Sequence, residues 1–272
     1  MKHKYLLVAL ALSMASGADA AMVSKELTYK IDDTEFKSAL VYDDSVKTAR
    51  PGLVMFPNWY GMNAGQIEKA KAIAGKRYVV LVADVYSAEV RPADDKAAGA
   101  AATAMYKDRG VLRARAKAAL DVLKAQGETV ALDSAKIGAI GFCFGGATAL
   151  ELARSGADLD GVVSFHGNLS SDDPSLAKNI KGSVLALNGA DDKYVPAEQI
   201  QAFAAEMRDA NVDWQFVNLG GAVHCFAESD AKSPPGCLYN ERAAKRGFAL
   251  MHTFFDEAFK EPLNKSGAAI AP

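Results

Sequence analysis

The stretch from Ile137 to Leu150 constrains the fold of this chain more than any other. It opens with an apolar run of strand length, Ile137-Gly138-Ala139-Ile140, and it closes with Ala- and Leu-rich sequence of helical spacing. Between these runs stands Gly141-Phe142-Cys143-Phe144-Gly145, a Gly-x-Cys-x-Gly motif. The pattern predicts a strand, a sharp turn and a helix, with Cys143 on the turn.

The two outer glycines of this motif have a steric role. A residue on so tight a turn has a strained backbone, and bulky side chains two positions before and after it would collide as the helix packs on the strand. Gly141 and Gly145 remove these collisions. The pattern is that of a nucleophile elbow with Cys in place of Ser, in which the N–H of Phe144 points at the group that the thiol attacks. A simpler interpretation is that Cys143 is a small buried apolar residue and the glycines only permit close packing.

Length and charge narrow the class of protein. The 272 residues are 50% hydrophobic, so the chain can bury a large core within a single α/β domain. The net charge is −2, and the Lys and Arg residues are scattered without a run. Nucleic acid is therefore not an expected partner. The sequence leaves the oligomeric state open.

The N-terminus has the pattern of an export signal. Lys2 and Lys4 precede an apolar stretch over residues 5–14, and Ala18-Asp19-Ala20 supplies small residues where a signal peptidase would cut. We expect a signal peptide over residues 1–20, a single mature domain over 21–272, and a periplasmic or secreted protein. The apolar stretch is too short to span a bilayer, and no later segment is long and apolar enough. The alternative is a cytosolic protein with an apolar start.

Export changes the interpretation of the three cysteines. In an oxidising compartment Cys225 and Cys237, twelve positions apart, could close a small disulfide loop and leave Cys143 as the odd thiol. Two alternatives remain open at this point. Both residues could be reduced, or Cys143 could pair with Cys225, which would abolish any thiol chemistry.

The order of apolar runs predicts the architecture. Residues 26–31 and 35–41 flank Asp32-Asp33-Thr34 as a β-hairpin at a sheet edge. Strands are expected at 52–56, 78–83, 136–140, 161–165, 183–188 and 214–219, and helices at 66–74, 93–105, 108–126, 144–154, 197–210 and 239–259. This alternation predicts an α/β fold: a mostly parallel central sheet with helices on both faces and an N-terminal antiparallel hairpin. Residues 262–272 are expected to form a frayed tail.

Two later strand ends carry an acid and a base. The strand over 183–188 leads into Gly189-Ala190-Asp191-Asp192, and the strand over 214–219 leads into Gly220-Gly221-Ala222-Val223-His224. An Asp in a turn is usually a turn former, and a lone His is more often structural than catalytic. The chain order nucleophile, acid, base is nevertheless that of an α/β-hydrolase, with each group on its own strand-end loop.

These motifs resemble the dienelactone hydrolase family, whose members are α/β-hydrolases with a Cys, Asp, His triad. The resemblance covers most of the mature chain, and it implies that Cys143 is the nucleophile and His224 the base. Asp192 matches the acid better than Asp191, because the family's Gly-x-x-Asp-x-x-Val-Pro spacing counts from Gly189. Residues 55–61 match the family's oxyanion loop, which makes the N–H of Trp59 the second donor beside that of Phe144.

The chain departs from the family pattern at two positions. Family members of the best-known type carry a Glu where this chain has Asn58, and that carboxylate is thought to hold the thiol protonated until substrate arrives. Asn cannot take a proton, so His224 would activate Cys143 alone. Just after the base, the family's lactone hydrolases place an Arg that binds a substrate carboxylate, whereas this chain has Glu228. This change argues against the same acidic lactone.

Further substrate contacts are expected near the same sheet edge. Trp59, Tyr60 and Phe142 could line an apolar pocket, although aromatic residues at strand ends are as often core. His166 follows another strand, where it could contact substrate or make a structural hydrogen bond. Tyr86 and Arg91 follow a further strand and are weaker candidates. No His or acidic pair has metal-ligand spacing and no loop has the pattern of a phosphate cradle, so we expect no metal and no cofactor.

Together these features predict a hydrolase of small esters or lactones that uses Cys143, His224 and Asp192 through a thioester intermediate. The main alternative is a non-catalytic binding or sensory protein that has kept the fold, which the residues at positions 58 and 228 favour. A thiol–disulfide enzyme would need a Cys-x-x-Cys motif, which the sequence lacks.

Overall fold

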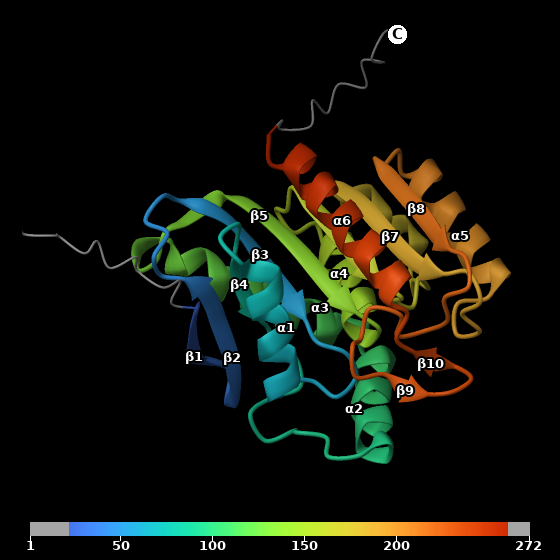
Figure 1. Cartoon of the computed structure of the whole chain (residues 1–272), viewed down its shortest axis with the longest axis horizontal. Helices are drawn as coiled ribbons and strands as arrows, with labels where there is room; N and C mark the ends of the chain where they lie inside the picture. Colours follow the sequence, from blue (N-terminus) through green and yellow to red (C-terminus); the bar gives the residue numbers. More distant parts are fainter. Residues whose placement is uncertain (1–21, 261–272) are drawn as a thin grey trace, which may run out of the picture.

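The computed structural model describes residues 22–260 (Figure 1). The predicted signal peptide and the predicted tail over 262–272 lie outside the described residues. The central layer is an eight-stranded sheet of order β1-β2-β4-β3-β5-β6-β7-β8. Its strands are Met22–Ile31 (β1), Thr34–Asp43 (β2), Arg50–Phe56 (β3), Val79–Val82 (β4), Leu132–Phe142 (β5), Gly161–Phe165 (β6), Ser183–Gly189 (β7) and Trp214–Leu219 (β8).

The direction of the strands confirms the predicted architecture. β1 pairs with β2 and β2 pairs with β4 in antiparallel register, while the other neighbouring strands of this sheet are parallel. The N-terminal hairpin therefore forms one edge, as its Asp32-Asp33-Thr34 turn predicts, and Asp32 has the positive φ of 51° that a tight turn requires. Because β3 to β8 run in the same direction, their carboxyl ends meet at one rim of the sheet.

Six α-helices lie among the described residues, each within a few residues of its predicted position. They are Ala64–Ala74 (α1), Asp95–Lys107 (α2), Arg109–Lys124 (α3), Phe144–Arg154 (α4), Ala197–Asp209 (α5) and Glu241–Ala258 (α6). The sequence did not predict the short strands Lys232–Ser233 (β9) and Cys237–Leu238 (β10), or the 3-10 turns Ala125–Glu128 (η1) and Pro174–Asn179 (η2). Runs of two to six residues are too short to show a hydrophobic period.

The helices cover both faces of the sheet (Figure 1). One core cluster packs α1 and α6 against one face, through side chains such as Ile73, Met251 and Phe255. The other packs α3, α4 and α5 against the opposite face, through side chains such as Leu120, Leu150 and Phe203. Within residues 22–260 no helix is long and apolar enough to cross a bilayer.

The predicted elbow between β5 and α4 has the expected strain. Cys143 has φ 55° and ψ −117°, a conformation that L residues rarely adopt. A Cβ on Gly141 would stand 1.9 Å from the carbonyl oxygen of Gly145, and a Cβ on Gly145 would stand 2.0 Å from that of Phe56. Since both contacts are with backbone, neither clash can be relieved by a side-chain rotation.

We expect Gly145→Ala to destabilise the protein by about 3 kcal/mol or more, because the methyl group must displace β3 or α4. The measurement is urea-induced unfolding of the variant beside the parent. Gly220→Ala is the matched control, since a Cβ there meets nothing within 4 Å. Equal losses of stability in the two variants would contradict this account of the elbow.

A buried ionic network fixes the helix that follows the elbow. All eleven residues of α4 are buried, including Glu151 and Arg154. Arg154 makes two hydrogen bonds of 2.8 Å to Glu206, and Glu151 binds Arg154, Arg109 and Arg113 at 2.7–3.0 Å. Buried charges are costly unless they are paired, so these contacts hold α4 in one position. The N-terminus of α4, where Cys143 stands, is thereby held as well.

Candidate active site

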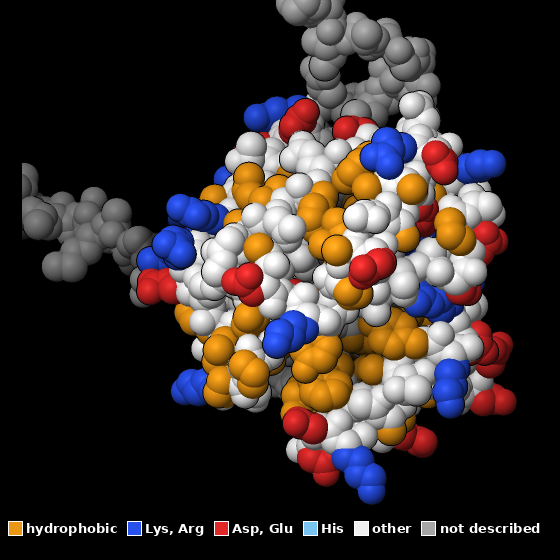
Figure 2. Space-filling model, turned by 90° about the vertical axis from the view of Figure 1, so that its right-hand side faces the viewer, with side chains coloured by type: hydrophobic (Ala, Val, Ile, Leu, Met, Phe, Trp, Pro, Cys, Tyr) orange, Lys and Arg blue, Asp and Glu red, His pale blue; other side chains and the backbone are white. Residues whose placement is uncertain are grey.

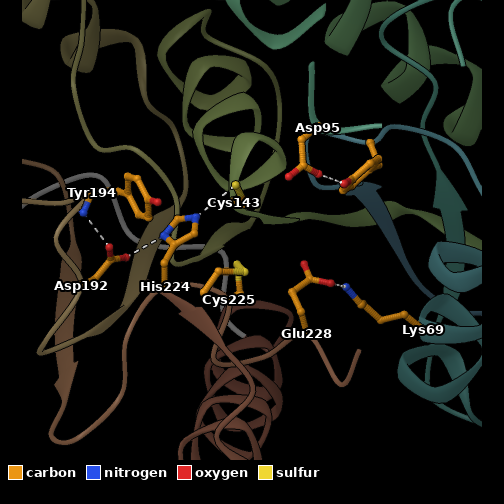
Figure 3. The surroundings of a disulfide bond; sticks show 10 residues. Lys69, Asp95, Cys143, Asp192, Tyr194, His224, Cys225 and Glu228 are labelled. Atoms are coloured by element: carbon orange, nitrogen blue, oxygen red, sulfur yellow. Dashed lines mark hydrogen bonds and ion pairs between the residues drawn. A yellow bond between two sulfur atoms is a disulfide. The ribbon is translucent and has the colours of Figure 1, made fainter. Parts of the chain in front are cut away.

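Three side chains from different strand ends meet at the carboxyl rim of the sheet (Figure 3). Cys143 follows β5, Asp192 follows β7 and His224 follows β8. The Nε2 atom of His224 lies 3.1 Å from the Sγ atom of Cys143, and its Nδ1 atom lies 2.7 Å from the Oδ2 atom of Asp192. The imidazole therefore bridges the thiol and the carboxylate, in the arrangement that the chain order predicts.

The structure distinguishes the two neighbouring aspartates. Asp192 is 6% exposed, and its second oxygen accepts a 2.8 Å hydrogen bond from the N–H of Tyr194. Asp191 is exposed to solvent and contributes no side-chain contact to His224. The carboxylate at the imidazole is thus that of Asp192.

The surroundings of His224 favour its protonated form. Burial of the ring opposes protonation, but the hydrogen bonds and charges of Asp192 and Cys143 outweigh it and raise the pKa of His224 to about 10. The ring of Tyr194 stands edge-on against the imidazole, with 5.1 Å between the centroids. His224 is therefore able to accept a proton from its neighbour and to hold it.

The two residues predicted to supply oxyanion donors line the same cavity as Cys143. Phe144 is the first residue of α4, and Trp59 lies on the loop after β3; both residues line the cavity at Cys143. Neither amide donates a hydrogen bond to any residue within 22–260. The Tyr86 hydroxyl donates to the carbonyl oxygen of Trp59 at 3.0 Å, and its ring stacks on Phe144. Tyr86 thus holds the loop that carries Trp59. Arg91, which follows the same strand, forms an ion pair with Asp84.

The cavity around Cys143 has two lobes of different character. The apolar lobe has a volume of about 390 Å³ and is lined chiefly by Trp59, Tyr106, Phe144 and Val195. The polar lobe has a volume of about 560 Å³. Its wall includes the polar and charged side chains of Asn58, Tyr60, Asp95, Glu228, Asp230, Lys232 and Ser233. Cys143, Trp59 and Tyr194 line both lobes, so the thiol stands where the lobes meet.

The hairpin closed by Cys225 and Cys237 forms part of the wall of both lobes. Cys225 and Cys237 are bonded to each other, which leaves Cys143 as the free thiol. This pairing is the predicted one. The hairpin includes β9 and β10, and the N–H of Leu238 donates to the carbonyl oxygen of His224 at 3.1 Å. The disulfide loop is therefore tied directly to the backbone of His224.

Asn58, Tyr60 and Glu228 line the polar lobe, so Tyr60 does not line the apolar pocket expected for it. The Oδ1 atom of Asn58 accepts the N–H of Tyr60 at 3.1 Å, so its side chain also closes the turn of the oxyanion loop. The Tyr60 hydroxyl donates to Asp95.

The structure corrects the prediction for Phe142, which does not line either lobe. Its side chain is fully buried on the α6 face of the sheet, stacked on Phe165 with 4.8 Å between the centroids. Side chains alternate across a strand, so the last residue of β5 faces away from α4 while the next residue turns toward the cavity. Being next to the nucleophile in sequence therefore does not place Phe142 in the pocket around Cys143.

His166 is the second correction, because it neither lines the cavity nor makes a structural hydrogen bond. It is fully buried, and neither ring nitrogen has a hydrogen-bond partner among residues 22–260. Its ring packs edge-on against those of His224 and Phe226, with centroids 5.0 and 5.2 Å away. Burial, with the charges of His224 and Lys69, holds the pKa of His166 well below its usual range.

We expect His166 to make the folded state sensitive to acid. Below pH 6.5 the unfolded chain protonates this residue while the folded chain does not, so stability falls by about 1.4 kcal/mol per pH unit. Above pH 6.5 the residue is neutral in both states and contributes no pH dependence. His166→Phe should remove this slope, which thermal unfolding between pH 5 and 7.5 measures. Parallel curves for variant and parent would contradict the assignment.

Sequence reasoning missed several residues of the cavity wall. Tyr106 comes from α2, while Asn168 and Val195 come from loops after β6 and β7. Tyr194 could have been found from its position two residues after Asp192. Tyr106 carries no such signal, because only the tertiary packing of α2, which contacts α3, brings it to the site.

A thiol on a strand-to-helix turn, followed by a carboxylate and an imidazole on later strand ends of a mostly parallel sheet, defines the α/β-hydrolase fold. Within that fold, the profile of the dienelactone hydrolase family matches residues 36–259. The chain belongs to the dienelactone hydrolase family, and it is by that membership an ester hydrolase.

Individual relatives resemble this chain in sequence and in structure. An uncharacterized protein of Caenorhabditis elegans is 38% identical over 160 residues, which are 57% of this chain and 99% of that protein. The solved structure named m3DLH is 38% identical, with a TM-score of 0.83 over 88% of this chain and 99% of that chain. P91 from metagenomic libraries, described as a dienelactone hydrolase-like promiscuous phosphotriesterase, is 38% identical, with a TM-score of 0.82 over the same shares.

Proposed function

We propose that this protein hydrolyses small esters or lactones with Cys143 as the nucleophile. The observation that carries the proposal is the bridging position of His224, with Nε2 at 3.1 Å from the thiol and Nδ1 at 2.7 Å from Asp192. A base within hydrogen-bond reach of a nucleophile, oriented by a third group, is the arrangement that nucleophilic catalysis requires.

In the proposed reaction, Cys143 gives its proton to the Nε2 atom of His224 and the sulfur attacks the substrate carbonyl carbon. The carbonyl oxygen becomes an oxyanion, which the N–H groups of Trp59 and Phe144 stabilise. His224 then protonates the departing alcohol oxygen and leaves a thioester on Cys143. Water, deprotonated by His224, hydrolyses the thioester and restores the thiol. Asp192 stabilises the imidazolium throughout.

His224 has to activate the thiol alone in this proposal. The side chain at position 58 is an amide, and its Oδ1 atom is occupied by the N–H of Tyr60. The raised pKa of His224 supports its role, because a more basic imidazole holds the proton that the thiol releases.

The test is a panel of short-chain esters, lactones and thioesters offered to the purified protein. Turnover that depends on the protein supports the proposal, and inertness toward the whole panel contradicts it. The rate at which iodoacetamide alkylates Cys143, followed against pH, separates catalysis from the non-catalytic alternative. Catalysis requires fast alkylation at neutral pH that slows in His224→Gln, whereas a binding protein predicts equal rates.

We also propose that the protein is exported, with residues 1–20 removed and residues from 21 onward forming one domain. The Cys225–Cys237 disulfide supports export, since such bonds persist in oxidising compartments. Mass measurement of the purified mature protein, with and without reductant, tests both the cleavage and the bond.

A further inference from the structure

The polar lobe has an excess of acidic side chains in its wall. Asp95, Glu228 and Asp230 line it, and the cation among its lining residues is Lys232. Asp95, Asp230 and Lys232 are exposed to solvent at the rim, whereas Glu228 is 3% exposed. On the face shown in Figure 2, hydrophobic side chains occur in both halves and form their larger patches in the lower half, with charged side chains scattered around them. Because Glu228 is the buried charged residue in the wall of the polar lobe, the buried charge there is negative.

The position of Glu228 is fixed from two sides. Its N–H donates to the carbonyl oxygen of Cys225 at 2.9 Å, and its own carbonyl oxygen accepts from Ala231 at 3.0 Å. Its Oε2 atom binds the ammonium of Lys69, which also lies 4.2 Å from the centroid of the Phe142 ring. Lys69 is thereby held on the far side of the carboxylate and does not line the polar lobe.

The other oxygen of Glu228 has unused capacity for hydrogen bonding. Oε1 is buried and has no partner among residues 22–260. In Figure 3 the carboxylate of Glu228 points toward the space between Cys143 and Asp95, and all three residues line the polar lobe. A buried acceptor without a donor costs free energy, and a ligand that brings the donor recovers it.

We propose that the polar lobe selects esters whose polar end carries a hydrogen-bond donor, an ammonium or a hydroxyl group, and rejects esters that end in a carboxylate. This inference rests on the proposed function and names the substrate class of that site. A donor would meet Oε1 of Glu228, while a carboxylate would meet that anion at close range, because Lys69 is already engaged. Substrates that differ only in this terminal group are therefore hydrolysed at different rates, because a substrate without a donor leaves Oε1 of Glu228 without a hydrogen-bond partner.

The experiment compares four esters that share one acyl group and have alcohols of equal length, ending in dimethylammonium, hydroxyl, isopropyl or carboxylate. We expect kcat/KM for the ammonium and hydroxyl esters to exceed that of the isopropyl ester about tenfold or more, with the carboxylate ester about tenfold or more below it. Hydrolysis of all four at one rate would overturn this inference and leave the proposed function intact. Hydrolysis of none would contradict the proposed function itself.

Variants of the ion pair assign the preference to Glu228. In Glu228→Gln the advantage of the ammonium ester should vanish and the carboxylate ester should gain, because Lys69 then lacks its counter-ion. The double variant Lys69→Met with Glu228→Met replaces the pair by apolar groups, guards against misfolding, and should abolish both preferences. Glu68→Gln, which alters an exposed ion pair with Lys71 on the same helix, is the matched control and should keep the parent order. An unchanged order in the Glu228 variants would overturn the proposal.

Discussion

Replacing Cys143 by alanine is expected to lower kcat/KM at least about 10³-fold for every ester that the protein hydrolyses. In the proposed mechanism no thioester forms without the sulfur, and the proposed donors at Trp59 and Phe144 alone provide only a residual acceleration. A 10³-fold loss corresponds to about 4 kcal/mol of transition-state stabilisation. Steady-state kinetics with a chromogenic short-chain ester measure the effect.

The substitution should leave the fold intact. Cys143 is half-buried and loses one atom, while the glycines that permit the elbow are unchanged. Thermal unfolding of Cys143→Ala should therefore resemble that of the parent, which separates loss of chemistry from loss of structure. Activity within tenfold of the parent, in a variant purified free of other esterases, would show that a different group attacks the substrate.

Replacing Asp192 by asparagine is expected to produce the second large loss, of about 10²–10⁴-fold in kcat. An amide cannot stabilise the imidazolium, and it favours the wrong tautomer of His224 at the 2.7 Å contact. Folding should again be preserved, because the side chain keeps its shape and its acceptor for the N–H of Tyr194.

Asp191→Asn is the matched control, since it makes the same chemical change one residue away on an exposed side chain. Its kcat should stay within a factor of about two of the parent, as is usual for surface substitutions without specific contacts. If Asp191→Asn were the impaired variant, the assignment of the acid would be wrong.

The elements that fix the site could be predicted because their signals are local. The elbow requires glycine at positions 141 and 145, because a Cβ at either position would stand about 2 Å from a backbone oxygen. The sequence pattern therefore has a steric cause. Asp192 and His224 follow apolar runs of strand length, and parallel strands bring their carboxyl ends to one rim. The same reasoning predicts the order of the three groups.

Residues whose role depends on packing could not be predicted in this way. Phe142 and Cys143 are neighbours in sequence, yet the alternation of the strand sends one into the core and the other to the cavity. His166 stands at a strand end like the catalytic candidates, but its ring is fully buried and packs edge-on against the ring of His224. Tyr106 lines the apolar lobe only because the tertiary structure places α2 beside it. Each of these outcomes is a property of the tertiary structure.

The most direct test of the central claim is to trap the acyl group on the protein during turnover. The protein is mixed with an activated ester, quenched in acid within milliseconds, digested and mapped by mass spectrometry. The account predicts one acyl group on the peptide that contains Cys143, removed by hydroxylamine as a thioester is, and absent from Cys143→Ala. An acyl group on any other residue would contradict it.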